Sequence, residues 1–194
     1  MKFCHGLIGA PPKDWNRLAR ACEAAGFDSV AVSDHVLFPA TLESKYPYTP
    51  DGTPLFSPDE DWPDAWVAIA SMAAVTTTLH FITNVFVLPS RSPFLAAKSI
   101  GTAAYLSEGR IGLGVGAGWM REEFDLLEQP FSKRGKRMEE MIEVMKALWT
   151  GEMVEHHGDF YDFAPVQMRP CPPAQIPIYV GGHSDIAFRR AATI

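Results

Sequence analysis

The sequence predicts an α/β fold with parallel strands, and three observations support this prediction. Short apolar runs alternate with helical patterns in five rounds along the chain. The run at 27–33 has Val, Ala and Val in succession at 30–32, as in strands buried on both faces. The run at 109–119 follows a helix stop at Gly109 and ends in glycines. This rhythm gives parallel strands with right-handed crossovers. A doubly wound sheet and an eight-fold barrel both fit it, as a single domain over residues 1–194.

The first two strands and the helix between them are predicted from residues 3–33. The apolar run at 3–9 precedes Pro11 and Pro12, which suit a turn. A helix follows and ends at Gly26, where a left-handed cap is favoured. Its predicted inner stripe is Leu18, Ala21, Cys22 and Ala25. The second strand is predicted at 27–33.

A long connection follows at 36–61 and is rich in proline and aromatic residues. Loops of this length in compact domains are usually functional, so we expect a lid or a pocket wall. The aromatic residues favour packing, and the alternative is a disordered insertion.

The middle of the chain predicts two more helices around a third strand. Asp61 is the predicted cap of the first helix. The inner face of that helix is Trp62, Trp66, Ile69 and Ala73. Residues 79–88 predict the strand, interrupted by the polar pair Thr83 and Asn84. Ser92 and Pro93 then begin a helix that runs to Gly109.

The stretch 109–119 is the predicted centre of the molecule, because its glycines would let a flat ligand lie against bare backbone. Residues 120–131 are expected to be an insertion. A helix with a methionine-rich inner face is predicted from Ser132 to Gly151, followed by a small hairpin at 153–163. Residues 178–180 predict the fifth strand, and a last helix begins near Ser184.

Composition restricts the partners. The chain of 194 residues is 47% hydrophobic and 21% charged, which is typical of a soluble globular domain. Its net charge of −6 disfavours nucleic acid and anionic membranes as partners, and no apolar run reaches the roughly 18 residues needed to span a bilayer. Cys4, Cys22 and Cys171 lack metal-site spacing and cannot all pair, which favours a cytoplasmic location.

The candidate chemistry lies where the predicted strands end, since ligands of parallel α/β folds bind at the carboxyl ends of strands. Asp34 and His35 give the strongest indication of catalytic residues there, because a histidine beside a carboxylate can move a proton near neutral pH. The alternative is that Asp34 caps a turn while His35 packs against the long connection. A metal-dependent hydrolase using His5, Asp34 and His35 is a rival, although the usual two-histidine strand motif is missing.

Two further patterns have competing interpretations. Gly112, Gly114 and Ala117 satisfy the loose form of a dinucleotide fingerprint, but no helix follows at once and no acidic residue ends a strand about twenty positions later. The basic cluster Lys133, Arg134, Lys136 and Arg137 lies on the first turn of a helix, where cations are unfavourable unless they face an anion. A cofactor phosphate would explain it, and so would a solvated helix face.

Several motifs in the same order along the chain resemble a known family. They are Ser33 to His35, Thr83 to Val85, the segment 107–119, Leu148 to Gly151 and the segment 176–182. Together they are similar to the bacterial luciferase-like flavin proteins, and most of all to the branch that uses the deazaflavin coenzyme F420. The likeness covers nearly the whole chain.

This resemblance implies a (β/α)8 barrel with a reduced flavin or deazaflavin across its strand ends. It implies that His35 acts near the hydride-carrying centre and that the Asn84–Val85 peptide bond is cis. Ala117, Gly118 and Trp119 would line the ring and side chain. The full set of implied cofactor-binding residues is Asp34, Asn84, Val85, Ala117, Gly118, Trp119, Gly181, Gly182, His183 and Ser184, of which the last four would hold phosphate.

The implied function is an oxidoreductase that uses F420, or alternatively FMN, for hydride transfer or monooxygenation of a small organic substrate. The sugar-phosphate dehydrogenase branch has a glutamate where this chain has Trp119, so that reaction is not expected here. A full barrel needs about 250 residues. We therefore expect a barrel truncated after strand five, as in a truncated gene product. The alternative is that the chain pairs with a second copy or with a missing C-terminal half. A non-catalytic binding or assembly module is the alternative.

Overall fold

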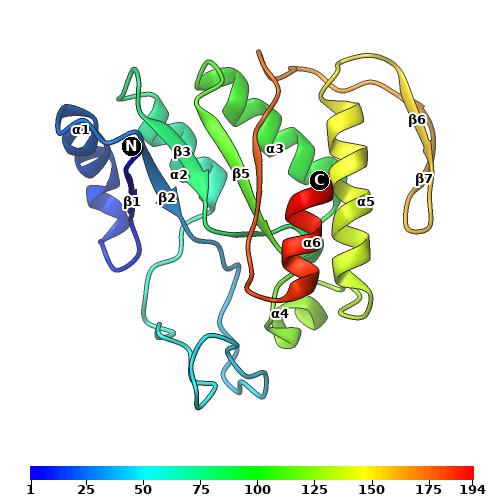
Figure 1. Cartoon of the computed structure of the whole chain (residues 1–194), viewed down its shortest axis with the longest axis horizontal. Helices are drawn as coiled ribbons and strands as arrows, with labels where there is room; N and C mark the ends of the chain where they lie inside the picture. The colour runs from blue at the N-terminus through cyan, green and yellow to red at the C-terminus, as the bar shows by residue number, and fades with distance from the viewer.

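A parallel sheet forms the centre of the computed structural model, which describes all 194 residues (Figure 1). Its strands pair in the order β1-β2-β3-β5-β8, and the short β4 also pairs with β5. Every pairing in this sheet is parallel, which confirms the prediction. The strand bounds are β1 Cys4–Gly6, β2 Ser29–Val32, β3 His80–Thr83, β4 Phe86–Val87, β5 Ile111–Gly116 and β8 Ile178–Val180.

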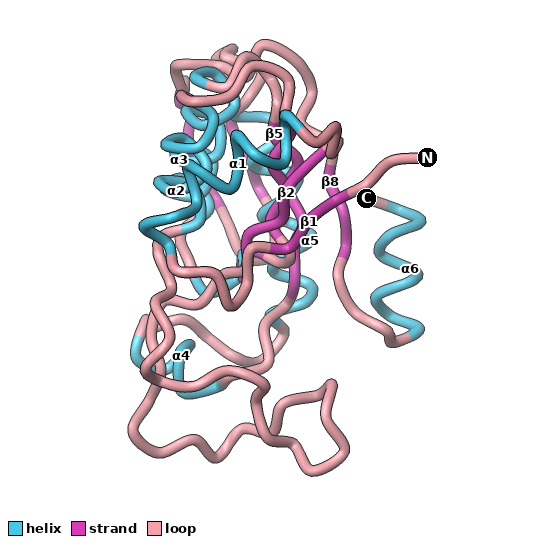
Figure 2. Tube along the Cα trace, turned by 90° about the vertical axis from the view of Figure 1, so that its left-hand side faces the viewer, coloured by secondary structure: helices cyan, strands magenta, loops and turns pink.

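Helices alternate with these strands, and Figure 2 shows α1, α2 and α3 together on one side of the sheet. None of the helices is both long and apolar enough to cross a bilayer. The α-helices are α1 Trp15–Ala24, α2 Ala65–Ala73, α3 Pro93–Leu106, α4 Arg121–Leu126, α5 Arg134–Leu148 and α6 Asp185–Thr193, and the 3-10 turns are η1 Pro12–Asp14 and η2 Leu88–Ser90.

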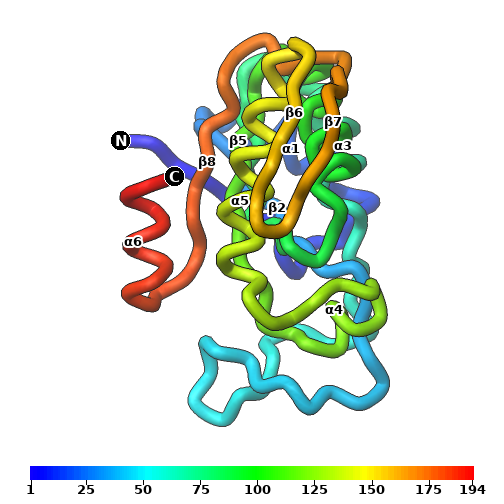
Figure 3. Tube along the Cα trace, turned by 90° about the vertical axis from the view of Figure 1, so that its right-hand side faces the viewer, coloured from blue at the N-terminus to red at the C-terminus, as the bar shows by residue number.

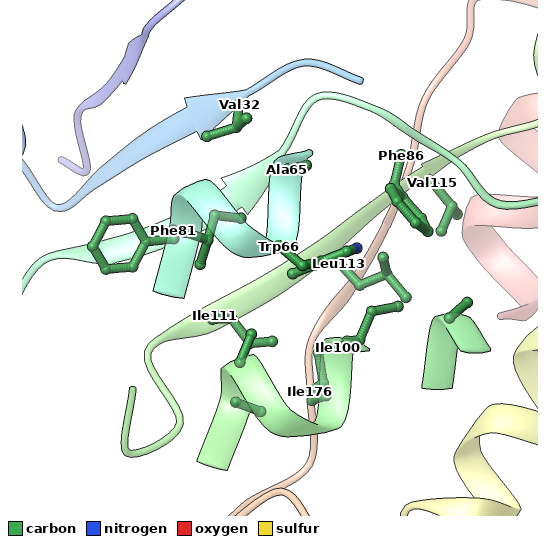
Figure 4. Close-up of a cluster of buried hydrophobic side chains, with 14 of the residues drawn as sticks. Val32, Ala65, Trp66, Phe81, Phe86, Ile100, Ile111, Leu113, Val115 and Ile176 are labelled. Carbon is green, nitrogen blue, oxygen red and sulfur yellow. The ribbon is translucent and has the colours of Figure 1, made fainter. Parts of the chain in front are cut away.

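The core lies between the sheet and helices α1, α2, α3 and α5 (Figure 4). Phe81, Ile111 and Leu113 come from strands and are at most 2% exposed, and they pack in one cluster with Trp66 of α2 and Ile100 of α3. All six residues of β5 are buried. The glycine-rich strand is therefore the centre of the molecule, as predicted.

Two predicted helix starts are wrong. α2 begins at Ala65, because the Asp64 carboxylate and not that of Asp61 accepts hydrogen bonds from the N–H groups of Trp66 and Val67, at 3.0 and 2.9 Å. α5 begins two residues after Ser132, because Lys133 has a left-handed φ of 57° and breaks the helical path before Arg134.

Three other predictions need correction. The segment 120–131 is not merely an insertion, since it contains α4. The buried face of α1 starts from Trp15 and continues at Ala19 and Cys22, which leaves Ala21 exposed. Ala25 of the predicted stripe is also exposed. The first strand is shorter than 3–9, and its three residues are exposed.

The hairpin is confirmed, and so is the interruption of the third strand, although Thr83 still belongs to β3. β3 and β4 are separated at Asn84 and Val85, whose peptide bond is cis. The antiparallel pair β6 Val154–His157 and β7 Asp162–Val166 lies outside the main sheet, beside α3 and α5 (Figure 3). Phe163 packs there against Phe94 of α3, with ring centroids 5.1 Å apart.

Candidate functional site

A cavity of about 540 Å³ lies at the carboxyl ends of the strands, which is within the usual range for small-molecule sites. Every site residue predicted from the sequence lines it: Asp34, His35, Asn84, Val85, Ala117, Gly118, Trp119, Gly181, Gly182, His183 and Ser184. These residues come from segments far apart in sequence, so the fold brings the predicted set together. Their individual roles stay predictions.

Val85 forms part of the cavity floor, between two glycines. A Cβ atom built on Gly116 would lie 2.5 Å from Val85 Cγ2, and one built on Gly181 would lie 2.5 Å from Val85 Cγ1. Real side chains do not approach so closely. The ends of β5 and β8 must therefore be bare backbone for Val85 to lie where it does.

His35 is held by Glu123, a residue that the sequence reasoning missed. His35 Nδ1 lies 3.3 Å from Glu123 Oε2, and the Val36 N–H donates to Glu123 Oε1 at 2.6 Å. The His35 ring also packs against Phe56 and Trp62, at centroid distances of 5.0 and 5.1 Å. Glu123 belongs to α4, and the apolar Met120 and Phe124 beside it were the available signal for a packed helix there.

The Asp34 carboxylate does not form the contact with His35 that their adjacency suggested. It accepts hydrogen bonds from the Val87 N–H at 2.9 Å and from Arg91 Nη2 at 2.7 Å. Burial raises the pKa of Asp34, while Arg91 and the Val87 N–H act against that rise. Asp34 and His35 have different side-chain partners, so the neighbour in sequence is not the partner in space. The carboxylate beside His35 is that of Glu123.

Two arginines line the cavity together with the residues at the start of α6. Arg134 Nε donates to the Gly118 carbonyl at 2.9 Å, and Arg190 Nε lies 2.5 Å from Glu139 Oε1. Burial lowers the pKa of Arg134, and the nearby charges of Arg121 and Arg190 lower it further. Arg134, whose partners are backbone carbonyls, therefore brings positive charge to a cavity that also includes a helix N-terminus, where free N–H groups favour an anion, while the charge of Arg190 is paired with Glu139.

The basic cluster is consequently not a single solvated face. Lys133 and Lys136 are exposed, whereas Arg134 reaches the cavity. Arg137 is buried and donates to the Pro89 carbonyl at 2.7 Å. The four residues thus divide between solvent, the cavity and a structural contact.

The long connection forms one wall of the cavity, as predicted, through Tyr46, Pro47, Tyr48 and Phe56. The Tyr46 ring lies 5.2 Å from that of Trp119, and Tyr48 lies 5.3 Å from His183. Figure 1 shows this segment looping below the sheet. The wall facing His35 is therefore mostly aromatic.

α4 also holds this connection through Glu122. Its Oε1 accepts from the N–H groups of Glu43 and Ser44, at 2.7 and 2.9 Å. Burial alone would raise the pKa of Glu122, but hydrogen bonds from its own N–H group, from the Ser44 hydroxyl and from these two N–H groups lower it to about 2. Glu122 thus binds the long connection, whereas its neighbour Glu123 binds the residues that follow β2.

The rival hydrolase set does not assemble. His5 does not line the cavity, and the Asp34 carboxylate is engaged by Arg91. No group of three or more His, Cys, Asp or Glu side chains is placed to hold a metal ion.

Comparison with known proteins gives a consistent result. A sequence profile described as luciferase-like monooxygenase matches residues 3–194. An uncharacterized protein of Mycobacterium tuberculosis is 47% identical over 175 residues, which cover 90% of this chain and 61% of that protein. The F420-dependent glucose-6-phosphate dehydrogenase of Segniliparus rotundus is 31% identical over 184 residues, which cover 93% of this chain and 50% of that enzyme.

A solved structure agrees on the fold. The structure of an F420-dependent secondary alcohol dehydrogenase with an F420-acetone adduct superimposes with a TM-score of 0.76, at 23% identity, over 98% of this chain and 56% of that one. The parallel sheet and its helices thus match the luciferase-like barrel fold over about half its length. The chain likewise spans only 50 to 61% of the length of these curated relatives.

Proposed function

The chain belongs to the luciferase-like monooxygenase family, and from this premise we propose that it binds the deazaflavin coenzyme F420 and transfers hydride between F420 and a small organic substrate. The F420-dependent relative at 31% identity supports the choice of coenzyme. FMN is the alternative within the same class of oxidoreductases. Trp119 replaces the glutamate of the sugar-phosphate dehydrogenase branch, so a sugar phosphate is not the proposed substrate.

The cavity suits such a coenzyme in its chemistry. Val85, Val87 and Trp119 supply apolar surface for a flat ring, and glycine backbone at Gly116 and Gly181 adds no bulk. Other lining residues supply hydrogen-bond donors: Arg134 is cationic, Arg190 is paired with Glu139, and the start of α6 adds backbone N–H groups. A phosphate-bearing ring system needs both kinds of surface.

The proposed roles follow from these surfaces. Gly181 to Ser184 and Arg134 would hold the phosphate, while Ala117, Gly118 and Trp119 would line the ring and side chain. When bound, the coenzyme supplies the hydride chemistry. His35 would move the accompanying proton through Nε2, which has no hydrogen-bond partner in the chain. The aromatic wall at Tyr46, Tyr48 and Phe56 would exclude water and select the substrate.

The single observation that carries the proposal is that one cavity joins His35, the bare strand ends and the cationic start of α6. The test is equilibrium binding of F420 and FMN to the purified chain, followed by absorbance and fluorescence. We expect F420 to bind about tenfold more tightly than FMN or better, a difference of about 1.4 kcal/mol. The reverse preference would favour an FMN-dependent oxygenase. Binding of neither would favour the non-catalytic assembly module.

We also propose that a second copy of the chain covers part of its surface. All three residues of β1 are exposed at a sheet edge, and Tyr179 on β8 and Phe188 on α6 are 50% and 62% exposed. Unpaired strand edges and exposed aromatic side chains favour association. Light scattering should give twice the chain mass of 21.4 kDa, and a monomer at high concentration would refute this pairing.

A further inference from the structure

We infer that Glu123 is a positioning residue that fixes the ring orientation and the tautomer of His35. Glu123 would set which nitrogen of His35 can accept a proton, so the functional meaning of this contact rests on the proposed function. The bonding pattern itself can be tested without the coenzyme.

Both carboxylate oxygens of Glu123 are engaged at the end of β2. Oε2 lies 3.3 Å from His35 Nδ1, and Oε1 accepts from the Val36 N–H at 2.6 Å. The Glu123 side chain is only 2% exposed and that of His35 only 11%. The carboxylate therefore holds the ring and the backbone that follows it, shielded from water.

This arrangement assigns the proton on the imidazole. A carboxylate has no hydrogen to donate, so Nδ1 must donate to Oε2. In the neutral ring the other nitrogen, Nε2, then carries the lone pair. Phe56 and Trp62 pack against the ring and oppose its rotation. The cavity thus receives a proton acceptor with a set orientation.

Replacement of Glu123 by glutamine should invert the tautomer. The amide oxygen has to accept the Val36 N–H, because an NH₂ group there would oppose another donor. The NH₂ group then faces His35 Nδ1 and can only donate to it. Nδ1 becomes the acceptor, and the ring proton moves to Nε2.

Glu122 offers a matched control on the same helix. It too is a glutamate whose carboxylate accepts backbone N–H groups, but its partners are Glu43 and Ser44. These partners differ from His35 and Val36, which Glu123 holds. Glu122→Gln therefore makes the same chemical change one residue away without touching the imidazole.

The experiment is ¹⁵N NMR of the histidine rings in the coenzyme-free chain at alkaline pH, with the His35 signals among the six histidines assigned through backbone correlations. We expect a protonated Nδ1 in the wild type and in Glu122→Gln, and a complete shift of the proton to Nε2 in Glu123→Gln. An unprotonated Nδ1 in the wild type would overturn the inference. An unchanged tautomer in a folded Glu123→Gln would also overturn it.

Two features keep the result interpretable. If Glu123→Gln does not fold, as judged by circular dichroism, the wild-type spectrum alone still decides the position of the proton. F420 binding to the same samples is measured separately. If Nδ1 is protonated but F420 does not bind, the proposed function is refuted and the bonding pattern stands. If F420 binds but Nδ1 is unprotonated, the bonding pattern is refuted and the proposed function stands.

Discussion

Arg91 Nη2 lies 2.7 Å from Asp34 Oδ1, and the Asp34 side chain is only 2% exposed. Because breaking a buried pair leaves an uncompensated charge, we expect Arg91→Met to lower the free energy of unfolding by about 3 to 5 kcal/mol. Urea denaturation at pH 7 measures this. Asp34→Asn combined with Arg91→Met should be less destabilised than Arg91→Met alone, and equal losses would contradict the explanation.

The same pair predicts a pH dependence. Burial raises the pKa of Asp34, and removal of the Arg91 charge should raise it further. When the pKa of a carboxyl is higher in the folded state than in the unfolded state, the folded chain loses stability as the pH rises from the unfolded pKa, about 3.9, toward the folded pKa. The deficit of Arg91→Met should therefore be largest near neutral pH and shrink as pH falls toward 4. A deficit independent of pH would argue against a charge effect.

The glycines beside Val85 predict a clash that can be relieved. A methyl group on Gly181 would lie 2.5 Å from Val85 Cγ1, so Gly181→Ala should destabilise the chain by about 1 to 3 kcal/mol. Val85→Ala in the same chain should recover part of this loss. Gly6→Ala is the control, because nothing lies within 4 Å of a Cβ there. Thermal unfolding of the four proteins gives the comparison.

Glu23 predicts an acid-sensitive contribution to stability. Its Oε1 accepts from the N–H groups of Thr77, Thr78 and Leu79, and these bonds, that of Thr78 foremost, lower its pKa to about 2. Its stabilisation is complete above the ordinary value of 4.5 and is lost as pH falls toward 2. Glu23→Gln should therefore be less stable than wild type at pH 7.

The difference between wild type and Glu23→Gln should disappear near pH 2 in denaturant titrations. Glu152 is exposed and its carboxylate forms no hydrogen bond, so Glu152→Gln should match the wild type throughout. A difference between Glu23→Gln and wild type that persists at the acid end would show that lost packing, rather than charge, is responsible.

We expect the positive charge of Arg134 to contribute to the affinity for F420. Arg134→Ala should weaken F420 binding by about ten- to a hundredfold, since a hydrogen bond to a charged group contributes about 1.5 to 3 kcal/mol. Inorganic phosphate should compete with F420 in the wild type and less so in the variant. Lys136→Ala on the same helix is exposed and should bind as the wild type does. Equal weakening by both changes would point to a general loss of positive charge.

Trp119 predicts an optical signal for binding, because it lines the cavity beside Tyr46. Coenzyme binding should quench tryptophan fluorescence, and Trp119→Phe should reduce that quenching to the share of Trp62, which also lines the cavity. Trp15 lies in α1 and does not line the cavity, so Trp15→Phe should retain it. Quenching that is unchanged in Trp119→Phe would place the ring elsewhere.

The sequence predicts well that the strands are parallel and which residues line the cavity, because both depend on local patterns. The glycine-rich β5 and the ends of β2 and β8 are recognisable from short motifs, and parallel strands bring their carboxyl ends together. The start of α2 is harder to predict from the sequence, since Asp61 and Asp64 are both suitable N-cap residues. Only the path of the chain decides which carboxylate reaches the helix.

Pairing between distant side chains could not be predicted. His35 and Glu123 are 88 residues apart in sequence, and no local pattern connects them. Asp34 suggested itself as the partner by adjacency, yet its carboxylate faces Arg91. A single sequence specifies which residues gather at an edge of the sheet, but the direction of each side chain depends on packing from elements elsewhere in the chain.

The two neighbouring glutamates of α4 separate two tasks that share one cavity. Glu122 fastens the irregular segment that carries Tyr46 and Tyr48, whereas Glu123 secures the imidazole on the sheet. Under the proposed function, substitutions in that segment would change which molecules are admitted and leave the position of the imidazole intact. Relatives of this chain could then differ in substrate range while sharing one arrangement for proton transfer.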